Sequence, residues 1–196
     1  MSRLLLDYDN TICNFSQMMC NRWNKITVHS FEEHPFYIED VKDYSLHKCL
    51  LDKGYDKQTV DFLIDNFWFT PNIYQEEYID MPCREIILKI VKEFSSLGFE
   101  IVLHTMCCSN EMAISKLEKL YKDYDLLKYV SEIKLDLLVD KKNYIKDTDY
   151  DVIIDDNPVF IKEYLEKNPT GVAFVPKWIY NDVAGINDNK RVTMVE

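Results

Sequence analysis

Short apolar runs alternate with longer segments of mixed polarity along most of the chain. The apolar runs span residues 3–6, 99–104, 133–139, 152–154 and 172–175. Continuous apolar runs this short are typical of strands that are buried on both faces of a parallel sheet. The pattern therefore predicts a buried strand in each run.

Segments with apolar residues at helical spacing lie between these runs, at residues 15–25, 82–97, 111–124 and 158–167. Pro82 suits the first turn of a helix, and Gly98 suits the position after its last turn. Asn157 followed by Pro158 gives an N-cap and a first-turn proline for the last of these helices. In residues 111–124 the expected buried side consists of Ile114, Leu117, Leu120 and Tyr121.

The alternation of strands and helices predicts an α/β fold, in which one parallel sheet lies between two layers of helices in the Rossmann-like manner. Residues 16–80 interrupt this alternation just after the first strand. The segment is rich in aromatic residues, and residues 56–67 have the pattern of a helix. We interpret residues 1–15 and 81–196 as the core and residues 16–80 as a helical cap over one end of the sheet.

Composition limits the classes of partner. The 196 residues are 47% hydrophobic, which is enough for a packed core. The formal net charge of −11 repels long polyanions and leaves no basic face that could follow a nucleic-acid backbone. We therefore expect no nucleic-acid polymer as a partner. A small anionic substrate remains compatible, because a bound cation and a lysine can reverse the potential inside a cleft.

The amino-terminal residues and the cysteines indicate the compartment. The first residues, MSRLLLDYDN, carry carboxylates too early for a signal peptide, and no stretch approaches the roughly 18 apolar residues of a membrane span. Six cysteines without an export signal are expected to be reduced thiols. These features predict a cytoplasmic protein without a membrane partner, and they leave a homodimer open.

Polar side chains gather where the expected strands end, and ligands of open parallel sheets bind beyond these carboxyl ends. The residues at those ends are Asp7, Asp9, Thr105, Lys141, Asp155 and Asp156. Four carboxylates in one cleft repel one another unless a cation lies among them. Oxygen ligands without His or Cys favour Mg²⁺. The sequence therefore predicts a Mg²⁺ site at this end of the sheet.

These residue types suit phosphoryl transfer. Asp7 could act as a nucleophile and form an aspartyl-phosphate, while Asp9 could protonate the leaving oxygen and then deprotonate the attacking water. Thr105 could donate a hydrogen bond to a phosphate oxygen, and Lys141 could compensate the negative charge of the transition state. Two alternatives stay open, namely that Thr105 is an ordinary strand residue and that Lys142 takes the place of Lys141.

The order of these residues resembles the four motifs of the haloacid dehalogenase (HAD) superfamily. Residues 4–11, LLLDYDNT, resemble the first motif, an apolar run followed by DxDxT, and residues 101–105, IVLHT, resemble the second. Asp140-Lys141 resembles the third motif, and residues 152–156, VIIDD, resemble the fourth. This resemblance spans nearly the whole chain and implies an HAD-like phosphatase that requires Mg²⁺.

The resemblance also implies a role for each matching residue. Asp7 would be the nucleophile and Asp9 the general acid and base, while Thr105 and Lys141 would hold the phosphate. The implied metal ligands are the Asp7 carboxylate, the Asp9 main-chain carbonyl and Asp156, with Asp155 in support. The alternative for Asp155 and Asp156 is a loop in which Asp156 caps the following helix, but the presence of Asp7 favours metal binding.

Within the superfamily, the chain most resembles the 5′(3′)-deoxyribonucleotidases, whose cap also follows the first motif. Phe15 matches an aromatic residue that in this group lies against the nucleotide base. The run Phe67-Trp68-Phe69 resembles the group's second aromatic cluster. The resemblance therefore implies a nucleotide substrate, with Phe15, Phe67 and Trp68 at the base. Alternatively, the cluster forms the core of the cap.

Two stretches depart from the group's pattern. Asn10 stands where the group usually has glycine, and Met106-Cys107-Cys108 follows Thr105 in place of small polar residues and proline. These departures leave the phosphate loop and the choice of substrate open. The two cysteines do not indicate a thiol nucleophile, because no arginine follows them to hold a phosphate.

Other functions remain compatible with parts of the pattern. An HAD phosphatase could act on a sugar phosphate, a phosphoserine or a nucleic-acid 3′-phosphate, although the acidic charge argues against the last. A phospho-acceptor signalling domain also uses aspartates, a threonine and a lysine on a parallel sheet, but in another order along the chain. A catalytically silent binding protein of the same fold is the third alternative.

Overall fold

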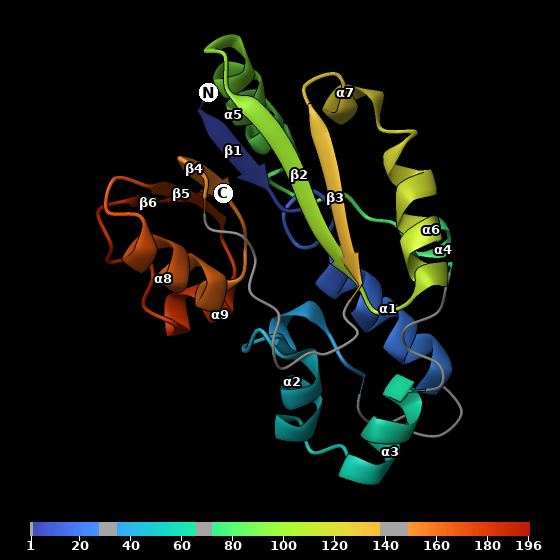
Figure 1. The fold of residues 1–196 in the computed structure, drawn as a ribbon. Coiled ribbons are helices and arrows are strands. Elements are labelled where there is room, and N and C mark those ends of the chain that lie inside the picture. Colours follow the sequence, from blue (N-terminus) through green and yellow to red (C-terminus); the bar gives the residue numbers. More distant parts are fainter. Residues whose placement is uncertain (1, 28–34, 66–71, 138–148) are drawn as a thin grey trace.

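The computed structural model describes residues 2–27, 35–65, 72–137 and 149–196. The strands among these residues form a six-stranded sheet (Figure 1). Its strand order is β3-β2-β1-β4-β5-β6, and each neighbouring pair is parallel. The strands are β1 (Arg3–Leu6), β2 (Glu100–Cys107), β3 (Glu132–Leu137), β4 (Val152–Ile154), β5 (Val172–Pro176) and β6 (Val192–Val195). The predicted α/β fold is confirmed.

The two faces of the sheet pack against different helices. Because successive side chains of a strand point to opposite faces, Leu4 and Leu6 belong to one apolar cluster and Leu5 to the other. Ile87 of helix α5 (Arg84–Ser96) lies in the first cluster, and Ile161 of helix α8 (Pro158–Lys167) lies in the second. The sheet is therefore the middle of three layers, and its central strands are buried on both sides.

The core elements lie close to where the sequence pattern predicts them. Helix α8 starts at Pro158, and the side chain of Asn157 accepts hydrogen bonds from the backbone of Val159 and Phe160, as predicted for an N-cap. The pattern was less accurate at other boundaries. Helix α5 starts at Arg84, two residues after the expected Pro82, and β2 continues to Cys107. Helix α9 (Ile179–Val183) and strand β6 were not predicted at all.

The segment between β1 and α5 supplies several short helices. They are α1 (Phe15–Thr27), the 3₁₀ helix η1 (Ile38–Asp40), α2 (Leu46–Asp52), α3 (Lys57–Leu63) and α4 (Ile73–Glu76). Figure 1 shows α1, α2 and α3 beyond the ends at which β1 and β2 terminate. Asp56 accepts hydrogen bonds from the backbone of Gln58 and Thr59, which makes it the N-cap of α3. The interpretation of residues 16–80 as a separate cap remains a prediction.

Helix α4 packs against α6 (Asn110–Leu120), which follows β2. The side-chain amide of Gln75 donates a hydrogen bond to the main-chain oxygen of Ser115, at 2.8 Å. Part of the inserted segment is thereby joined to the core beside the end of β2.

The helices and the cysteines of the described residues can be compared with the sequence expectations. Within the described ranges, no helix has both the length and the hydropathy that a membrane span requires. None of the six cysteines, all of which lie in the described ranges, is joined to another by a disulfide; five are buried and Cys108 is exposed.

Asn10 has a left-handed backbone, with φ of 55°, in the loop between β1 and α1. Its side-chain oxygen also accepts a hydrogen bond of 2.7 Å from the backbone nitrogen of Ser16, in the first turn of α1. Asparagine tolerates this backbone region better than residues with larger or branched side chains. Asn10 therefore supplies the conformation that glycine would give and adds a bond to the start of α1.

We expect Asn10→Ala to destabilise the protein by about 2 kcal/mol, since it combines left-handed strain with loss of the bond to α1. Asn10→Gly keeps the conformation and loses only the bond, so its cost should be about 1 kcal/mol lower. Urea unfolding followed by circular dichroism measures both. Equal destabilisation by the two variants would contradict this role of the backbone conformation.

Candidate active site

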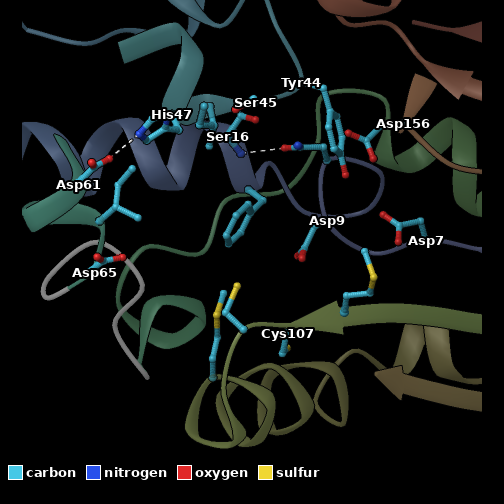
Figure 2. Close-up of a pocket in the computed structure, with 17 residues that line it drawn as sticks. Asp7, Asp9, Ser16, Tyr44, Ser45, His47, Asp61, Asp65, Cys107 and Asp156 are labelled. Atoms are coloured by element: carbon cyan, nitrogen blue, oxygen red, sulfur yellow. Dashed lines mark hydrogen bonds and ion pairs between the residues drawn. The ribbon is translucent and has the colours of Figure 1, made fainter. Parts of the chain in front are cut away.

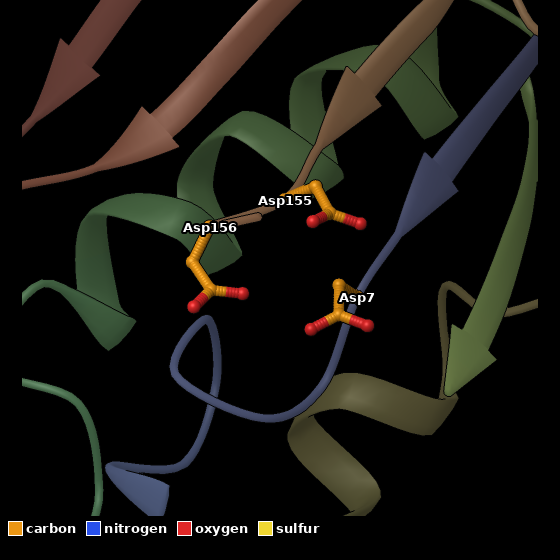
Figure 3. Close-up of side chains that lie close together, drawn as sticks. All are labelled: Asp7, Asp155 and Asp156. Carbon is orange, nitrogen blue, oxygen red and sulfur yellow. The ribbon is translucent and has the colours of Figure 1, made fainter. Parts of the chain in front are cut away.

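Three buried carboxylates meet where β1 and β4 end (Figure 3). The two strands are paired so that Leu6 lies beside Ile154, and the backbone nitrogen of Asp7 donates to the Ile154 oxygen at 2.9 Å. The residues that follow, Asp7 on one strand and Asp155 and Asp156 on the other, are thereby brought together. One carboxylate oxygen from each lies within 4.8 Å of the others.

The arrangement of these carboxylates suits a divalent cation. Asp7 is 7% exposed, Asp155 0% and Asp156 2%, so water screens their charges poorly. At an effective dielectric constant of about 20, two charges at this separation repel by roughly 3 kcal/mol. Oxygen donors without His or Cys are the ligands that Mg²⁺ and Ca²⁺ prefer. The structure thus brings together the three side chains that the sequence predicted as carboxylate ligands.

Asp156 is held by a neighbouring tyrosine that the sequence did not point to. The Tyr180 hydroxyl donates a hydrogen bond of 2.5 Å to Oδ2 of Asp156. Burial and the charge of Asp156 both raise the pKa of Tyr180 well above its ordinary value, so the phenol stays a neutral donor. Its ring stacks on Trp178 at 5.6 Å, and the Trp178 indole donates to the main-chain oxygen of Asn10 at 3.0 Å. These contacts fix the orientation of Asp156 relative to the loop that follows Asp7.

Asp9 points to a different set of partners. Its Oδ2 lies 2.6 Å from Nζ of Lys116, its Oδ1 accepts from the Tyr74 hydroxyl at 2.8 Å, and the Cys13 thiol lies 3.5 Å from Oδ1. Within the part of the chain that the structure describes, its carboxylate does not join the cluster of Asp7, Asp155 and Asp156. The sequence prediction concerned the main-chain carbonyl of Asp9 as a metal ligand, and that stays a prediction.

Thr105 lies in β2 and is fully buried. Its hydroxyl accepts a hydrogen bond of 2.8 Å from Lys116. Lys116 is thus the residue that joins Thr105 to Asp9. The proposed contact of Thr105 with phosphate remains a prediction.

A cavity of about 680 Å³ opens beside these groups (Figure 2). The residues after β1 that line it include Asp7, Asp9 and Asn10, and Asp156 lines it as well. Phe15, at the start of α1, lines it too. Residues 16–80 contribute Ser16, Tyr44, Ser45, Leu46, His47, Asp61, Ile64 and Asp65, and the end of β2 with α6 contributes Met106, Cys107, Cys108 and Met112. The cavity is of the size that proteins use for small organic ligands.

Two aromatic residues give the cavity planar surfaces. Phe15 lines the cavity, and its ring stacks on that of Tyr74, with the ring centroids 6.0 Å apart and 23° between the rings. Its predicted contact with a nucleotide base stays a prediction. Tyr44 lines the cavity and contacts the Tyr180 ring edge-on at 5.8 Å. Tyr44 was not predicted, because the sequence around it has no clear periodicity.

Other predicted residues lie outside the described part of the chain. They are the base-binding candidates Phe67 and Trp68, with their neighbour Phe69, and the phosphate-binding candidates Lys141 and Lys142. His47, for which no role was predicted from the sequence, lines the cavity, and its Nε2 lies 2.8 Å from Oδ1 of Asp61.

Of the side chains predicted to be buried in residues 111–124, Leu120 is buried, whereas Ile114 and Tyr121 are not. Ile114 and Tyr121 are 58% and 59% exposed, and the buried residues of α6 are Met112, Ala113, Ser115, Lys116 and Leu120. The apolar residues of the helix cover a wide arc that extends beyond the buried side, so their spacing alone did not identify that side. The spacing of four residues from Met112 to Lys116 and again to Leu120 was the signal that could have found the buried lysine.

Comparisons with known proteins bear on the fold. No protein-family model matches the sequence, and no curated protein matches it. A haloacid dehalogenase-like family hydrolase from Xanthomonas campestris matches with a TM-score of 0.54 and 12% identity, over 100% of this chain and 90% of that one. A hydrolase from Pseudomonas syringae matches with a TM-score of 0.53 and 13% identity, over 100% of this chain and 94% of that one.

A third solved structure agrees with these two. An HAD hydrolase of family IA, variant 3, from Entamoeba histolytica matches with a TM-score of 0.54 and 10% identity, over 98% of this chain and 92% of that one. Similarity at such low identity shows a shared fold and leaves the resemblance to deoxyribonucleotidases as a prediction. The chain has the α/β fold of the haloacid dehalogenase-like hydrolases.

Proposed function

We propose that the chain is a Mg²⁺-dependent phosphomonoesterase that hydrolyses (deoxy)ribonucleoside monophosphates, as a 5′(3′)-deoxyribonucleotidase does. The observation that carries this proposal is the meeting of the Asp7, Asp155 and Asp156 carboxylates beside a cavity of about 680 Å³. The fold agrees with it, since the solved structures of similar fold are described as hydrolases.

The reaction would proceed in two displacements. An oxygen of Asp7 attacks phosphorus, the bond from phosphorus to the substrate oxygen breaks, and Asp9 gives that oxygen a proton. In the second step Asp9 takes a proton from water, the water oxygen attacks phosphorus, and the Asp7 carboxylate leaves. A Mg²⁺ ion held by Asp7, Asp155 and Asp156 would supply positive charge that offsets the charge of the phosphate. Asp9 lines the same cavity as Asp7, as both roles require.

The aromatic lining supports a nucleotide as the substrate. Phe15 lines the cavity, and its ring stacks on that of Tyr74, which supports it from behind. A planar base gains more from such a ring than a sugar does, because two aromatic faces can stack. Tyr44, which lies further along the segment between β1 and α5, adds a second ring to the cavity lining.

A panel of 5′- and 3′-deoxyribonucleoside monophosphates and sugar phosphates, with and without Mg²⁺, tests this proposal. We expect dUMP or dTMP to be hydrolysed well above the sugar phosphates. Phe15→Leu should raise the KM for nucleotides about tenfold, because it removes the stacking ring but keeps an apolar side chain, and it should leave the KM for sugar phosphates nearly unchanged. Equal hydrolysis of all the esters, or faster hydrolysis of the sugar phosphates, would contradict the nucleotide assignment. Absence of phosphate release from every ester would contradict the phosphatase function itself.

A further inference from the structure

Lys116 is a buried cation that the two displacements do not use. It lies on α6, its side chain has no exposed surface, and its ammonium group contacts three acceptors. These are Oδ2 of Asp9 at 2.6 Å, Oγ1 of Thr105 at 2.8 Å and the main-chain oxygen of Met106 at 2.6 Å. An ammonium group has three N–H donors, so this set of acceptors uses all of them.

The positive charge of Lys116 persists in this position. Burial would lower the pKa of the amine, but the negative charge of Asp9, together with Cys107, opposes this, and the pKa is raised. Placing such a pair in the interior has a desolvation cost of several kcal/mol, and apolar residues often replace buried ion pairs without loss of stability. Stability alone therefore does not explain a lysine at this position.

The contacts fix Asp9 from two directions. Lys116 binds one carboxylate oxygen from α6, and the hydroxyl of Tyr74 binds the other from α4, at 2.8 Å. Burial is the main cause that raises the pKa of Tyr74, and the charge of Asp9 raises it further, so the hydroxyl remains protonated and can donate. The neighbouring residues Gln75 and Ser115 hydrogen-bond to each other, which holds the two helices together. The Asp9 carboxylate therefore has little freedom to rotate.

We propose that Lys116 is a positioning residue for Asp9, which it holds at the cavity in the orientation needed to exchange a proton with the leaving oxygen. This inference rests on the proposed phosphatase function and adds a residue to it. Lys116 would act through Asp9 without touching the substrate, because its side chain is enclosed and its donors are occupied. Its bonds to Thr105 and Met106 tie the loop after β1 to the end of β2.

The dependence on the leaving group tests this role. Formation of the aspartyl-phosphate from an alkyl ester such as dUMP needs a proton on the leaving oxygen, whereas p-nitrophenolate leaves without one. In single-turnover experiments, Lys116→Met should slow the step with dUMP about 100-fold or more, in the range typical of a lost general acid. With p-nitrophenyl phosphate, the release of p-nitrophenolate should slow by less than about fivefold.

Two further variants complete the test. Lys122→Met removes an exposed lysine that follows α6, and it should change neither rate. The side-chain amide of Lys116→Gln can still donate hydrogen bonds, so its rate with dUMP should lie between those of the unmodified protein and Lys116→Met. This variant replaces Lys116→Met in the test if Lys116→Met does not fold. An equal loss of rate with both substrates would overturn the proposal. Failure of both Lys116 variants to fold would also overturn it, because the lysine would then be required for stability of the fold. If the unmodified protein hydrolyses neither ester, the phosphatase proposal fails instead.

Discussion

Replacing Asp7 with asparagine is expected to abolish phosphate release while the protein stays folded. The side-chain amide of the Asp7→Asn variant cannot form the acyl-phosphate, and loss of a nucleophile of this kind lowers turnover by about 10⁴-fold or more. The fold should tolerate the change because Asp7 is one of three carboxylates whose oxygens lie within 4.8 Å. Removing one charge relieves repulsion, so the unfolding temperature in metal-free buffer should not fall. Phosphate release and circular dichroism on heating measure the two effects.

A control at the surface separates this effect from a general loss of charge. Asp125→Asn changes an aspartate whose side chain is 77% exposed and pairs with Lys128, and it should alter neither turnover nor stability. Normal turnover in Asp7→Asn would overturn the role of Asp7. A large drop in its unfolding temperature would show that the carboxylate is needed for folding.

Removal of divalent cations is expected to abolish turnover and to lower stability. A cation that binds only the folded protein adds about 1.4 kcal/mol to its stability at ten times its dissociation constant. The effect arises because Asp7, Asp155 and Asp156 are buried beside one another and the cation offsets their repulsion. Titration of the chelated protein with Mg²⁺, followed by unfolding temperature and by phosphate release, measures both.

Substitutions should locate the cation among the acidic residues of the cavity. Asp156→Asn should raise the Mg²⁺ concentration for half-maximal activity at least about tenfold, since even partners of metal ligands contribute this much. Asp61→Asn alters a cavity aspartate outside the cluster and should leave that concentration unchanged. Full activity in the presence of a chelator, or an unchanged Mg²⁺ requirement in Asp156→Asn, would contradict the site.

The sequence was sufficient to predict the layers of the fold and the carboxylate cluster. Buried parallel strands read as continuous apolar runs, and each run that ends in an aspartate delivers that aspartate to the same edge of the sheet. Asp7 and the pair Asp155 and Asp156 could be placed together for this reason. Asn10 looked like a departure from the expected glycine, and its left-handed backbone explains why asparagine serves there.

The residues that orient the carboxylates could not be predicted in this way. Lys116 and Tyr180 look solvated in the sequence. The spacing of Met112, Lys116 and Leu120 marks a buried side of α6, but it does not identify the partners, which come from distant elements. Lys116 meets Asp9 across 107 positions of the chain, and Tyr180 meets Asp156 across 24. Periodicity reports the apolar face of an element and gives no information on such pairs. Helix α9 is too short for a periodic signal.

The central claim is that Asp7 carries the phosphoryl group during turnover. Acid quenching during hydrolysis of p-nitrophenyl phosphate, followed by borohydride reduction, converts an aspartyl-phosphate to homoserine, which peptide mass spectrometry locates. We predict homoserine in place of Asp7 and unmodified Asp9, Asp155 and Asp156. Homoserine at one of those three positions, or none in protein quenched during active turnover, would contradict the assignment of Asp7 as the nucleophile.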